Sequence, residues 1–446
     1  MKERIQLPDI HHCTGCQACR AVCPTNAISM QENEKGHIYP VINENLCISC
    51  NKCAKTCPEI RKVDRQTQLQ KVIACWVNDK YNRKRSSSGG MPYIFSRKIV
   101  SEGGYFCGVV YQHPGAEHQI CSNIDDLYKF QGSKYTHSDV KEVYSEINTL
   151  LKENKTVLFS GTPCQVAALR TYLHKPYPNL YCIDIICHGV PSRRLLRDRI
   201  KTVEAESRKR ITEIRFRDKN PDQFSSCVRY TFDDDKNLII PVQKEPYFRC
   251  FVTNYALREN CFNCQYSSRE RVGDITLADF WSYNPGGFKY RSYKKGTSVM
   301  IINSAQGEEL YKKVRPLLTV DEMCTIEQAA AGNHNLNAPQ PKPEHFNEFW
   351  SRYQNGESLE ALMPEYYPEQ PIQRTSITKK IKMYIYLLIP KFIKKNIKRL
   401  NLIFYFIRNQ LSHNNISYEK VYLQIPMVDI PPYQNLFQKS PNIQIP

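Results

Sequence analysis

Cysteine spacing is the feature of this chain that indicates its chemistry most directly. The run C-x-x-C-x-x-C-x-x-x-C-P occurs twice near the start of the chain, at Cys13, Cys16, Cys19 and Cys23 and again at Cys47, Cys50, Cys53 and Cys57. Three closely spaced thiolates can wrap one iron–sulfur cubane, and a fourth can reach a neighbouring one. Zinc also binds four cysteines, but a doubled run with proline after each last cysteine is typical of 4Fe–4S clusters. The pattern therefore predicts one-electron transfer.

The same spacing is that of bacterial two-cluster ferredoxins, in which the last cysteine of each run ligates the other cluster. We expect that last cysteine to open a short helix. One cluster is therefore assigned to Cys13, Cys16, Cys19 and Cys57. The second cluster is assigned to Cys47, Cys50, Cys53 and Cys23. Residues 1–60 are thus predicted to form a ferredoxin-like module.

Four further cysteines lie where ligands would be useful. Cys164 follows a predicted strand at 156–160, and Cys187 ends the next predicted strand. One helix joins these strands, so a right-handed crossover would make them near neighbours with both thiols at carboxyl ends. Cys261 and Cys264 have the short C-x-x-C spacing of a ligand pair. Spacing leaves ordinary buried thiols, zinc and a third 4Fe–4S cluster open, and we favour the cluster.

Two turns carry groups that suit a phosphate. In 86–90, three serines and two glycines lead into a predicted helix N-terminus, although a serine cap explains this turn equally simply. In 132–135, a glycine and a serine precede Lys134 and Tyr135, which supply a cation and an aromatic ring. Taken alone, that pair is more typical of solvated surface.

The elements that must position these residues alternate between strands and helices. Strands are predicted at 72–77, 105–111, 156–160 and 181–187, and helices at 92–101 and 165–173. This alternation predicts an α/β core with parallel strand pairs. We expect the core to end near Ala338, where Asn, Pro and Lys cluster.

Composition limits the remaining alternatives. The 446 residues suit two or three domains, and nineteen cysteines with eight in the two runs indicate metal ligation in a reducing compartment. The charged start of the chain predicts no secretory signal, so we expect a cytoplasmic protein. The net charge is +18, but half of it comes from the segment 375–409, which has nine Lys/Arg and no acid. The rest of the chain is only mildly basic, so no nucleic-acid role is indicated.

The segment 375–409 is predicted to be a basic amphipathic helix. Its cations fall on one side and its apolar residues on the other, which suits peripheral binding to the inner face of a membrane. Packing of the apolar face on the core or on a partner is the alternative. Residues 410–446 are rich in Asn, Gln and Pro, so we predict a poorly ordered tail.

The order of five motifs resembles one known family. The motifs are SSSGG, FQGSKYTHS, LFSGTPCQVAAL, DIICHGVPS and CFNCQYSSRERVGDITLADFW. This series resembles the coenzyme F420 hydrogenase/dehydrogenase beta-subunit family over residues 72–338, with the ferredoxin module fused in front. The resemblance implies an α/β core that binds FAD and its own 4Fe–4S cluster, with ligands Cys164, Cys187, Cys261 and Cys264.

The resemblance also implies which residues contact the flavin. By motif these are Ser88, Gly89, Gly90, Lys134, Tyr135, Ser138, Gly161 and Thr162. The expected cofactors are thus three 4Fe–4S clusters and one FAD, in an α+β or α/β fold behind the ferredoxin-like module. A proton donor near the flavin would suit most reductions, and His188 is a candidate by position. A histidine that holds its loop is the better interpretation.

These expectations predict an oxidoreductase. Electrons would pass from ferredoxin or a similar low-potential carrier through the clusters to FAD, and then to a two-electron substrate. Many bacterial members with this fusion look like accessory enzymes of cell-surface polysaccharide synthesis, which suggests a sugar-linked substrate. The alternative is a non-catalytic electron-transfer subunit of a larger hydrogenase or dehydrogenase complex, with coenzyme F420 as its linked carrier.

Overall fold

A computed structural model of the chain describes residues 6–66, 69–219, 226–283 and 295–367. These residues belong to one structural unit. The predicted basic helix at 375–409 and the predicted tail at 410–446 lie outside the described residues. No helix in the described ranges is long and apolar enough to cross a membrane.

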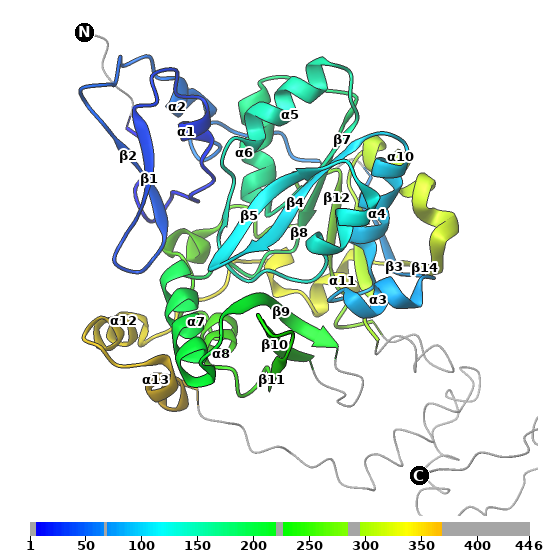
Figure 1. Cartoon of the computed structure of the whole chain (residues 1–446). Helices are drawn as coiled ribbons and strands as arrows, with labels where there is room; N and C mark the ends of the chain where they lie inside the picture. Colours follow the sequence, from blue (N-terminus) through cyan, green and yellow to red (C-terminus); the bar gives the residue numbers. More distant parts are fainter. Residues whose placement is uncertain (1–5, 67–68, 220–225, 284–294, 368–446) are drawn as a thin grey trace, which may run out of the picture. The chain divides into compact units, whose positions relative to one another are not determined.

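The ferredoxin-like module consists of two short helices and one hairpin (Figure 1). Its elements are α1 Ala18–Ala21, β1 Ile28–Glu32, β2 Ile38–Ile42 and α2 Lys52–Thr56. Strands β1 and β2 pair antiparallel, with Ile28 opposite Ile42.

The helices of the module differ from the prediction in one respect. Helix α1 contains Cys19 and α2 contains Cys53, whereas Cys23 and Cys57 follow the helix ends. Each helix starts after a residue with left-handed backbone, Gln17 in the first case, so the tight cysteine loop turns directly into the helix. The prediction that the last cysteine of each run opens a helix is therefore wrong.

Nine strands of the described chain form one large mixed sheet, in the spatial order β14, β3, β13, β12, β8, β7, β4, β5, β6. Their bounds are β3 Lys71–Val77, β4 Tyr105–Gln112, β5 Gly115–Cys121, β6 Ser138–Asp139, β7 Val157–Gly161, β8 Leu180–Ile185, β12 Ile275–Asp279, β13 Ser298–Ile302 and β14 Leu318–Cys324. The sheet is parallel from β12 through β8 and β7 to β4, and its flanking pairs are mostly antiparallel. The predicted α/β core is confirmed.

Strand direction gathers several loops at one edge of this sheet. Strands β7 and β8 are parallel neighbours, with Val157 opposite Leu180, as the crossover argument predicts. Strand β3 runs the same way, because β13 is antiparallel to both β3 and β12. Strand β6 runs the opposite way and begins at this edge with Ser138. The carboxyl ends of β3, β7 and β8 and the start of β6 therefore lie along the same edge of the sheet.

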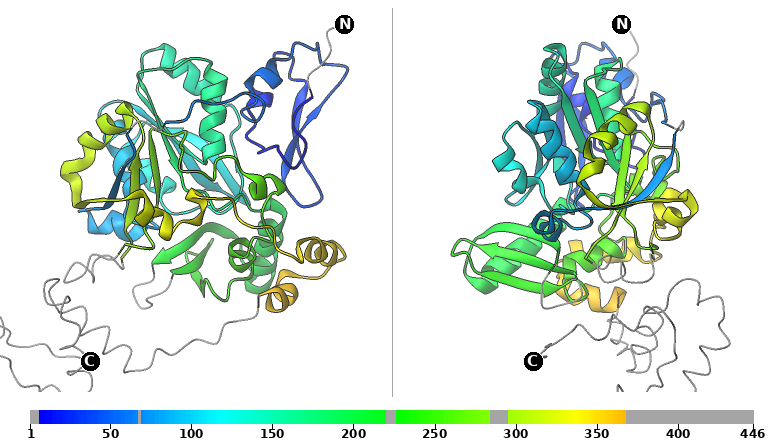
Figure 2. Two further views of the ribbon diagram at one scale, coloured as in Figure 1. Left: turned by 180° about the vertical axis from the view of Figure 1, so that it is seen from behind. Right: turned by 90° about the vertical axis from the view of Figure 1, so that its right-hand side faces the viewer.

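Helices cover both faces of the large sheet (Figure 2). Alternate residues of β7 point to opposite layers, so Val157 and Phe159 pack with α5 and α6 while Leu158 packs with α4 and α10. The helices and 3-10 turns of this part are α3 Lys80–Arg85, α4 Met91–Ser101, η1 Ile124–Phe130, α5 Val143–Lys152, α6 Pro163–Leu173, α10 Ala305–Val314, η3 Arg315–Leu317, α11 Ile326–Ala331 and η4 His334–Leu336.

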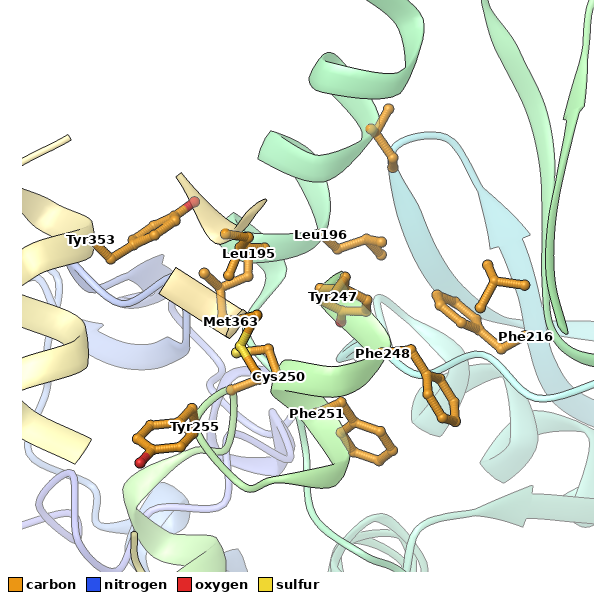
Figure 3. Close-up of a cluster of buried hydrophobic side chains, with 14 of the residues drawn as sticks. Leu195, Leu196, Phe216, Tyr247, Phe248, Cys250, Phe251, Tyr255, Tyr353 and Met363 are labelled. Atoms are coloured by element: carbon orange, nitrogen blue, oxygen red, sulfur yellow. The ribbon is translucent and has the colours of Figure 1, made fainter. Parts of the chain in front are cut away.

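A second sheet has three antiparallel strands, and it packs against helices that come before and after these strands in the sequence. These elements are α7 Arg193–Ser207, β9 Ile211–Lys219, β10 Ser226–Phe232, β11 Asn237–Pro241, α8 Pro246–Val252, η2 Glu259–Asn263, α12 Phe346–Gln354 and α13 Leu359–Tyr366. In Figure 3 the side chains of Leu195, Tyr247 and Met363, from α7, α8 and α13, lie in one buried cluster. The packed core therefore extends beyond the predicted end at Ala338, because α12 and α13 close it.

Candidate functional site

The four cysteines assigned to the first cluster line one cavity. Cys13, Cys16, Cys19 and Cys57 surround about 340 Å³ of empty volume, next to the loop at Gly15. Burial raises the pKa of the Cys16 thiol to about 12 and that of Cys57 to about 11. Both thiols are therefore protonated at neutral pH until iron displaces the protons. The exchanged ligand Cys57 lies with the first run, as the ferredoxin spacing predicts.

The core quartet lines a second cavity. Cys164, Cys187, Cys261 and Cys264 surround about 430 Å³ of empty volume. They come from three separate parts of the chain: the first turn of α6, the loop after β8, and η2 with the residue that follows it. Because β8 ends at Ile185, Cys187 lies in the following loop and does not end the strand as predicted.

Local hydrogen bonds fix the segments that carry the quartet. The Thr162 backbone N–H donates to Gln165 Oε1 at 3.0 Å, which caps α6 beside Cys164. The Val190 N–H donates to the Cys261 sulfur at 3.3 Å. Backbone N–H groups that point at sulfur stabilise thiolate and tune cluster potentials. Burial raises the pKa of Cys261 to about 11, so ligation here also requires proton release.

The remaining cysteines of the module lie nearer the surface. Burial raises the pKa of Cys53, and the charges of the Cys50 and Cys23 thiolates add to the rise. Cys47 belongs to the same loop, and Cys50 is exposed. The Ala27 N–H donates to the Cys23 sulfur at 3.3 Å.

These sulfur sets fit cubane clusters. Each of the two cavities offers four buried or half-buried thiols. Backbone N–H groups reach the sulfur of Cys23 in the outer set and of Cys261 in the core set. Within the described ranges, no three His, Cys, Asp or Glu side chains converge on the position of one metal ion. The ligand assignments themselves remain predictions from the sequence pattern.

The two cavities adjoin each other. Thr14 lines both of them. The Tyr144 hydroxyl bridges the module and helix α6, since it lies 3.1 Å from the Cys16 carbonyl, to which it donates, and 3.4 Å from the Gln165 carbonyl. Asn260 Nδ2 also donates to the His12 carbonyl at 2.8 Å. Direct contacts thus place the module's inner cysteine set beside the core quartet.

Two family models match separate parts of the chain. Residues 154–323 match the family model for the C terminus of the coenzyme F420 hydrogenase/dehydrogenase beta subunit. Residues 12–59 match the model of a 4Fe–4S dicluster domain. Residues 154–323 therefore carry the C-terminal domain of this beta-subunit family, behind a dicluster iron–sulfur module. The resemblance predicted from five motifs is confirmed, and with it an iron–sulfur protein related to subunits of electron-transferring oxidoreductases.

The individual relatives are distant. The F subunit of the F420H2 dehydrogenase of Methanosarcina mazei is 23% identical over 173 residues, which cover 35% of this chain and 47% of that protein. The chain therefore spans about half the length of that relative. An uncharacterised protein of Methanocaldococcus jannaschii is 22% identical over 370 residues, covering 72% of this chain and 91% of the relative. A chain of the F420-reducing NiFe hydrogenase complex from Methanosarcina barkeri matches with 14% identity and a TM-score of 0.38, covering 66% of this chain and 91% of that one.

The residues that family resemblance assigns to the flavin fall into two groups at the same sheet edge. In the first, Gly89 and Gly90 precede α4, and Gly90 has φ +92°, which only glycine adopts easily. The Ser88 hydroxyl donates to the Thr297 carbonyl at 2.9 Å. The Ser133 N–H donates to the Ser87 hydroxyl at 2.9 Å and joins this loop to the one that carries Lys134.

The second group lies next to the core quartet. The Gln165 amide donates to the Ser138 hydroxyl at 3.0 Å, which links β6 to the Gly161–Thr162 turn. The Thr162 hydroxyl lies 3.1 Å from the Cys164 sulfur. Tyr135 lies in the chain between the two groups, and its ring packs 4.7 Å from that of Phe251.

Three other polar residues, the candidate His188 and two carboxylates of the motif that follows the C-x-x-C pair, have structural partners. His188 lines the core cavity, and its Nε2 lies 3.2 Å from the Phe251 carbonyl, which fits the loop-holding interpretation. Asp274 accepts from Arg170, Ser304 and the Cys182 N–H. Asp279 forms a bidentate pair with Arg217. None of the three carries a catalytic assignment.

Cysteines outside the three sets are mostly core residues. Six are buried: Cys75, Cys107, Cys121, Cys182, Cys227 and Cys250. Cys324 is only half-buried. Burial of the six is typical of cysteine acting as a small apolar side chain.

Sequence reasoning missed several residues that surround the quartet. Thr14, Arg258, Asn260, Tyr266 and Ser267 line the core cavity, and none belongs to a ligand motif. The arginine lies three residues before the C-x-x-C pair, but nothing in its local sequence indicates that it is buried.

Proposed function

We propose that the chain is an electron-transfer subunit, which carries electrons between ferredoxin or a similar low-potential donor and a partner oxidoreductase. It would hold 4Fe–4S clusters in the two module sets and in the core quartet, and FAD at the adjoining sheet edge. Bound there, the clusters would exchange single electrons and the flavin two. The observation that carries the proposal is the shared wall at Thr14, which leaves the inner set and the quartet adjacent.

The exposure of the three cysteine sets supports this role, because it differs from the outer set to the inner ones. The outer set includes the exposed Cys50, and the exposed side chains of Leu46 and Ile48 flank its loop. The inner set is mostly buried and none of the quartet is exposed, so a protein donor would meet the outer set first. We therefore propose that the outer set is the entry point.

The relatives make a partner complex the favoured setting. One relative is a subunit of F420H2 dehydrogenase, so we propose an oxidoreductase complex as the partner, with coenzyme F420 as a candidate for its linked carrier. Catalysis by this chain alone, a sugar-linked substrate in polysaccharide synthesis and membrane association stay predictions from the sequence.

A reoxidation experiment tests the relay against a self-sufficient reductase. The anaerobically reconstituted chain is reduced with ferredoxin and then mixed with F420, with sugar nucleotides, or with a membrane-free extract of its own cells. A relay should stay reduced with the small molecules and reoxidise only with the protein fraction. Rapid reoxidation by one small molecule alone would instead show that the chain is an enzyme.

Lys134 supplies a test of the flavin site. Its ammonium donates to three backbone carbonyls, at 2.9–3.3 Å, and burial together with repulsion from Arg215 lowers its pKa to about 7. A bound phosphate would favour the charged form, so FAD binding above pH 7 takes up a proton. FAD affinity should therefore fall as the pH rises from 7 toward 10.

Lys134→Met should weaken FAD binding and flatten this pH dependence. Loss of one hydrogen bond to a charged group costs about 1.5–3 kcal/mol, roughly tenfold to a hundredfold in affinity. Lys219, whose pKa burial also lowers to about 7, should retain part of the dependence. The exposed Lys129→Met variant is the matched control, and flavin fluorescence titration measures all three proteins. Equal affinity of the Lys134 and Lys129 variants would contradict the assignment.

A further inference from the structure

Arg258 is a buried cation whose contacts are almost all uncharged. Its side chain has 0% exposure. Nη1 donates to the Ile38 carbonyl at 2.8 Å, and Nη2 lies 3.4 Å from His137 Nδ1. The guanidinium also lies 5.0 Å from the centre of the Tyr39 ring. Within the described part of the chain no carboxylate forms an ion pair with it.

Neighbouring titratable groups do not supply the missing negative charge. Glu259 is already paired with Lys35 at 3.0 Å and with Lys342 at 2.9 Å. Burial, reinforced by the charge of Arg258, lowers the pKa of His37 and of His137 well below the usual value, so both are neutral. A buried charge without a partner is strongly unfavourable, so an anion is expected nearby.

The guanidinium lies between the two adjoining cavities. Arg258 lines the core cavity. It also lies against Gly15 of the module cavity, where a Cβ would come within 2.5 Å of Nη1. One guanidinium therefore lies at the wall of both cysteine sets.

We infer that Arg258 is the shared counter-charge of the inner module cluster and the core cluster, and that it raises both reduction potentials together. The inference rests on the proposed function, because it requires clusters in both cavities. Reduction adds one electron to a cluster, and the guanidinium stays protonated, so no proton moves. A fixed positive charge favours the more negative reduced form and thereby raises its potential.

The first test replaces the charge in the full-length chain. Wild type, Arg258→Gln and Arg258→Lys are reconstituted anaerobically, assayed for iron, and titrated potentiometrically with detection by electron paramagnetic resonance. We expect Arg258→Gln to lower the reduction potentials of two clusters by about 59 mV each, which corresponds to a tenfold change in the one-electron reduction equilibrium. Arg258→Lys should recover most of the shift. The outer cluster should not change, which makes it an internal control.

The second test keeps the arginine and neutralises it. His137→Glu brings a carboxylate to the guanidinium, whereas the Gln side chain of His137→Gln has the same size as Glu but carries no charge. The Glu variant should lower the same two potentials, and the Gln variant should leave them near wild type. This pair decides the matter if Arg258→Gln fails to assemble.

The outcomes separate this inference from the proposed function. About eight irons in the wild type would show that the core cluster is absent, and this would contradict both the proposed function and the shared role of Arg258. About twelve irons with equal potentials in the two His137 variants would overturn the role of Arg258 alone. Equal shifts in Arg258→Gln and Arg258→Lys would also overturn it, because they would show that shape matters and charge does not.

Discussion

Cys261→Ser should remove about four of roughly twelve irons from the reconstituted chain and leave the two clusters of the module intact. The reason is geometric: Cys261 lines the core cavity with Cys164, Cys187 and Cys264, whereas Cys13 and its partners line a separate one. A serine hydroxyl is a poor ligand for iron, and the remaining three thiols carry raised pKa values from burial. Iron and acid-labile sulfide analysis measures the loss directly.

A matched variant strengthens this prediction. Cys250→Ser changes a buried cysteine of the same region that lies in the hydrophobic cluster and outside both cavities. It should keep about twelve irons. Wild-type protein with about eight irons and one zinc ion would contradict a cluster in the quartet. Equal iron content in the two cysteine variants would contradict the assignment of Cys261.

Sequence reasoning identified the sulfur sets because ligand spacing is a local property. The spacing within each ferredoxin run indicates which cysteines share a loop. The rule that crossover connections are right-handed correctly predicted that β7 and β8 are neighbours. These two arguments sufficed to predict that Cys164 and Cys187 lie together. The C-x-x-C spacing added the pair at Cys261 and Cys264 from another region of the chain, and the family resemblance implied the same four ligands.

Long-range packing was beyond the same reasoning. Nothing near Trp350 in the sequence indicates that its indole N–H donates to the Tyr255 carbonyl at 3.0 Å, yet this contact anchors α12 to the core. Arg258 is a similar case, since an arginine is normally exposed and only the assembled fold reveals its burial. The cysteine helices were mispredicted because left-handed residues such as Gln17 permit a turn that propensities do not favour.

Arg271→Met should destabilise the protein by about 3–5 kcal/mol, because it leaves Asp184 buried without its cation. Both side chains are almost fully buried, and Arg271 Nη2 lies 3.1 Å from Asp184 Oδ1. Arg271 also donates to the Ile185 carbonyl at 2.8 Å, at the end of β8, and to the Tyr266 carbonyl at 3.0 Å, next to the quartet. The pair thus holds together two segments that carry predicted ligands.

The neighbouring Arg269 provides the control. It pairs with Glu327 at 3.3 Å with both side chains exposed, so Arg269→Met should cost less than about 1 kcal/mol. Anaerobic urea unfolding followed by tryptophan fluorescence compares the two variants. Adding Asp184→Asn to Arg271→Met should recover part of the lost stability, since most of the penalty comes from the uncompensated carboxylate. If Arg271→Met is no less stable than Arg269→Met, the ion pair does not organise the loops around the core cavity.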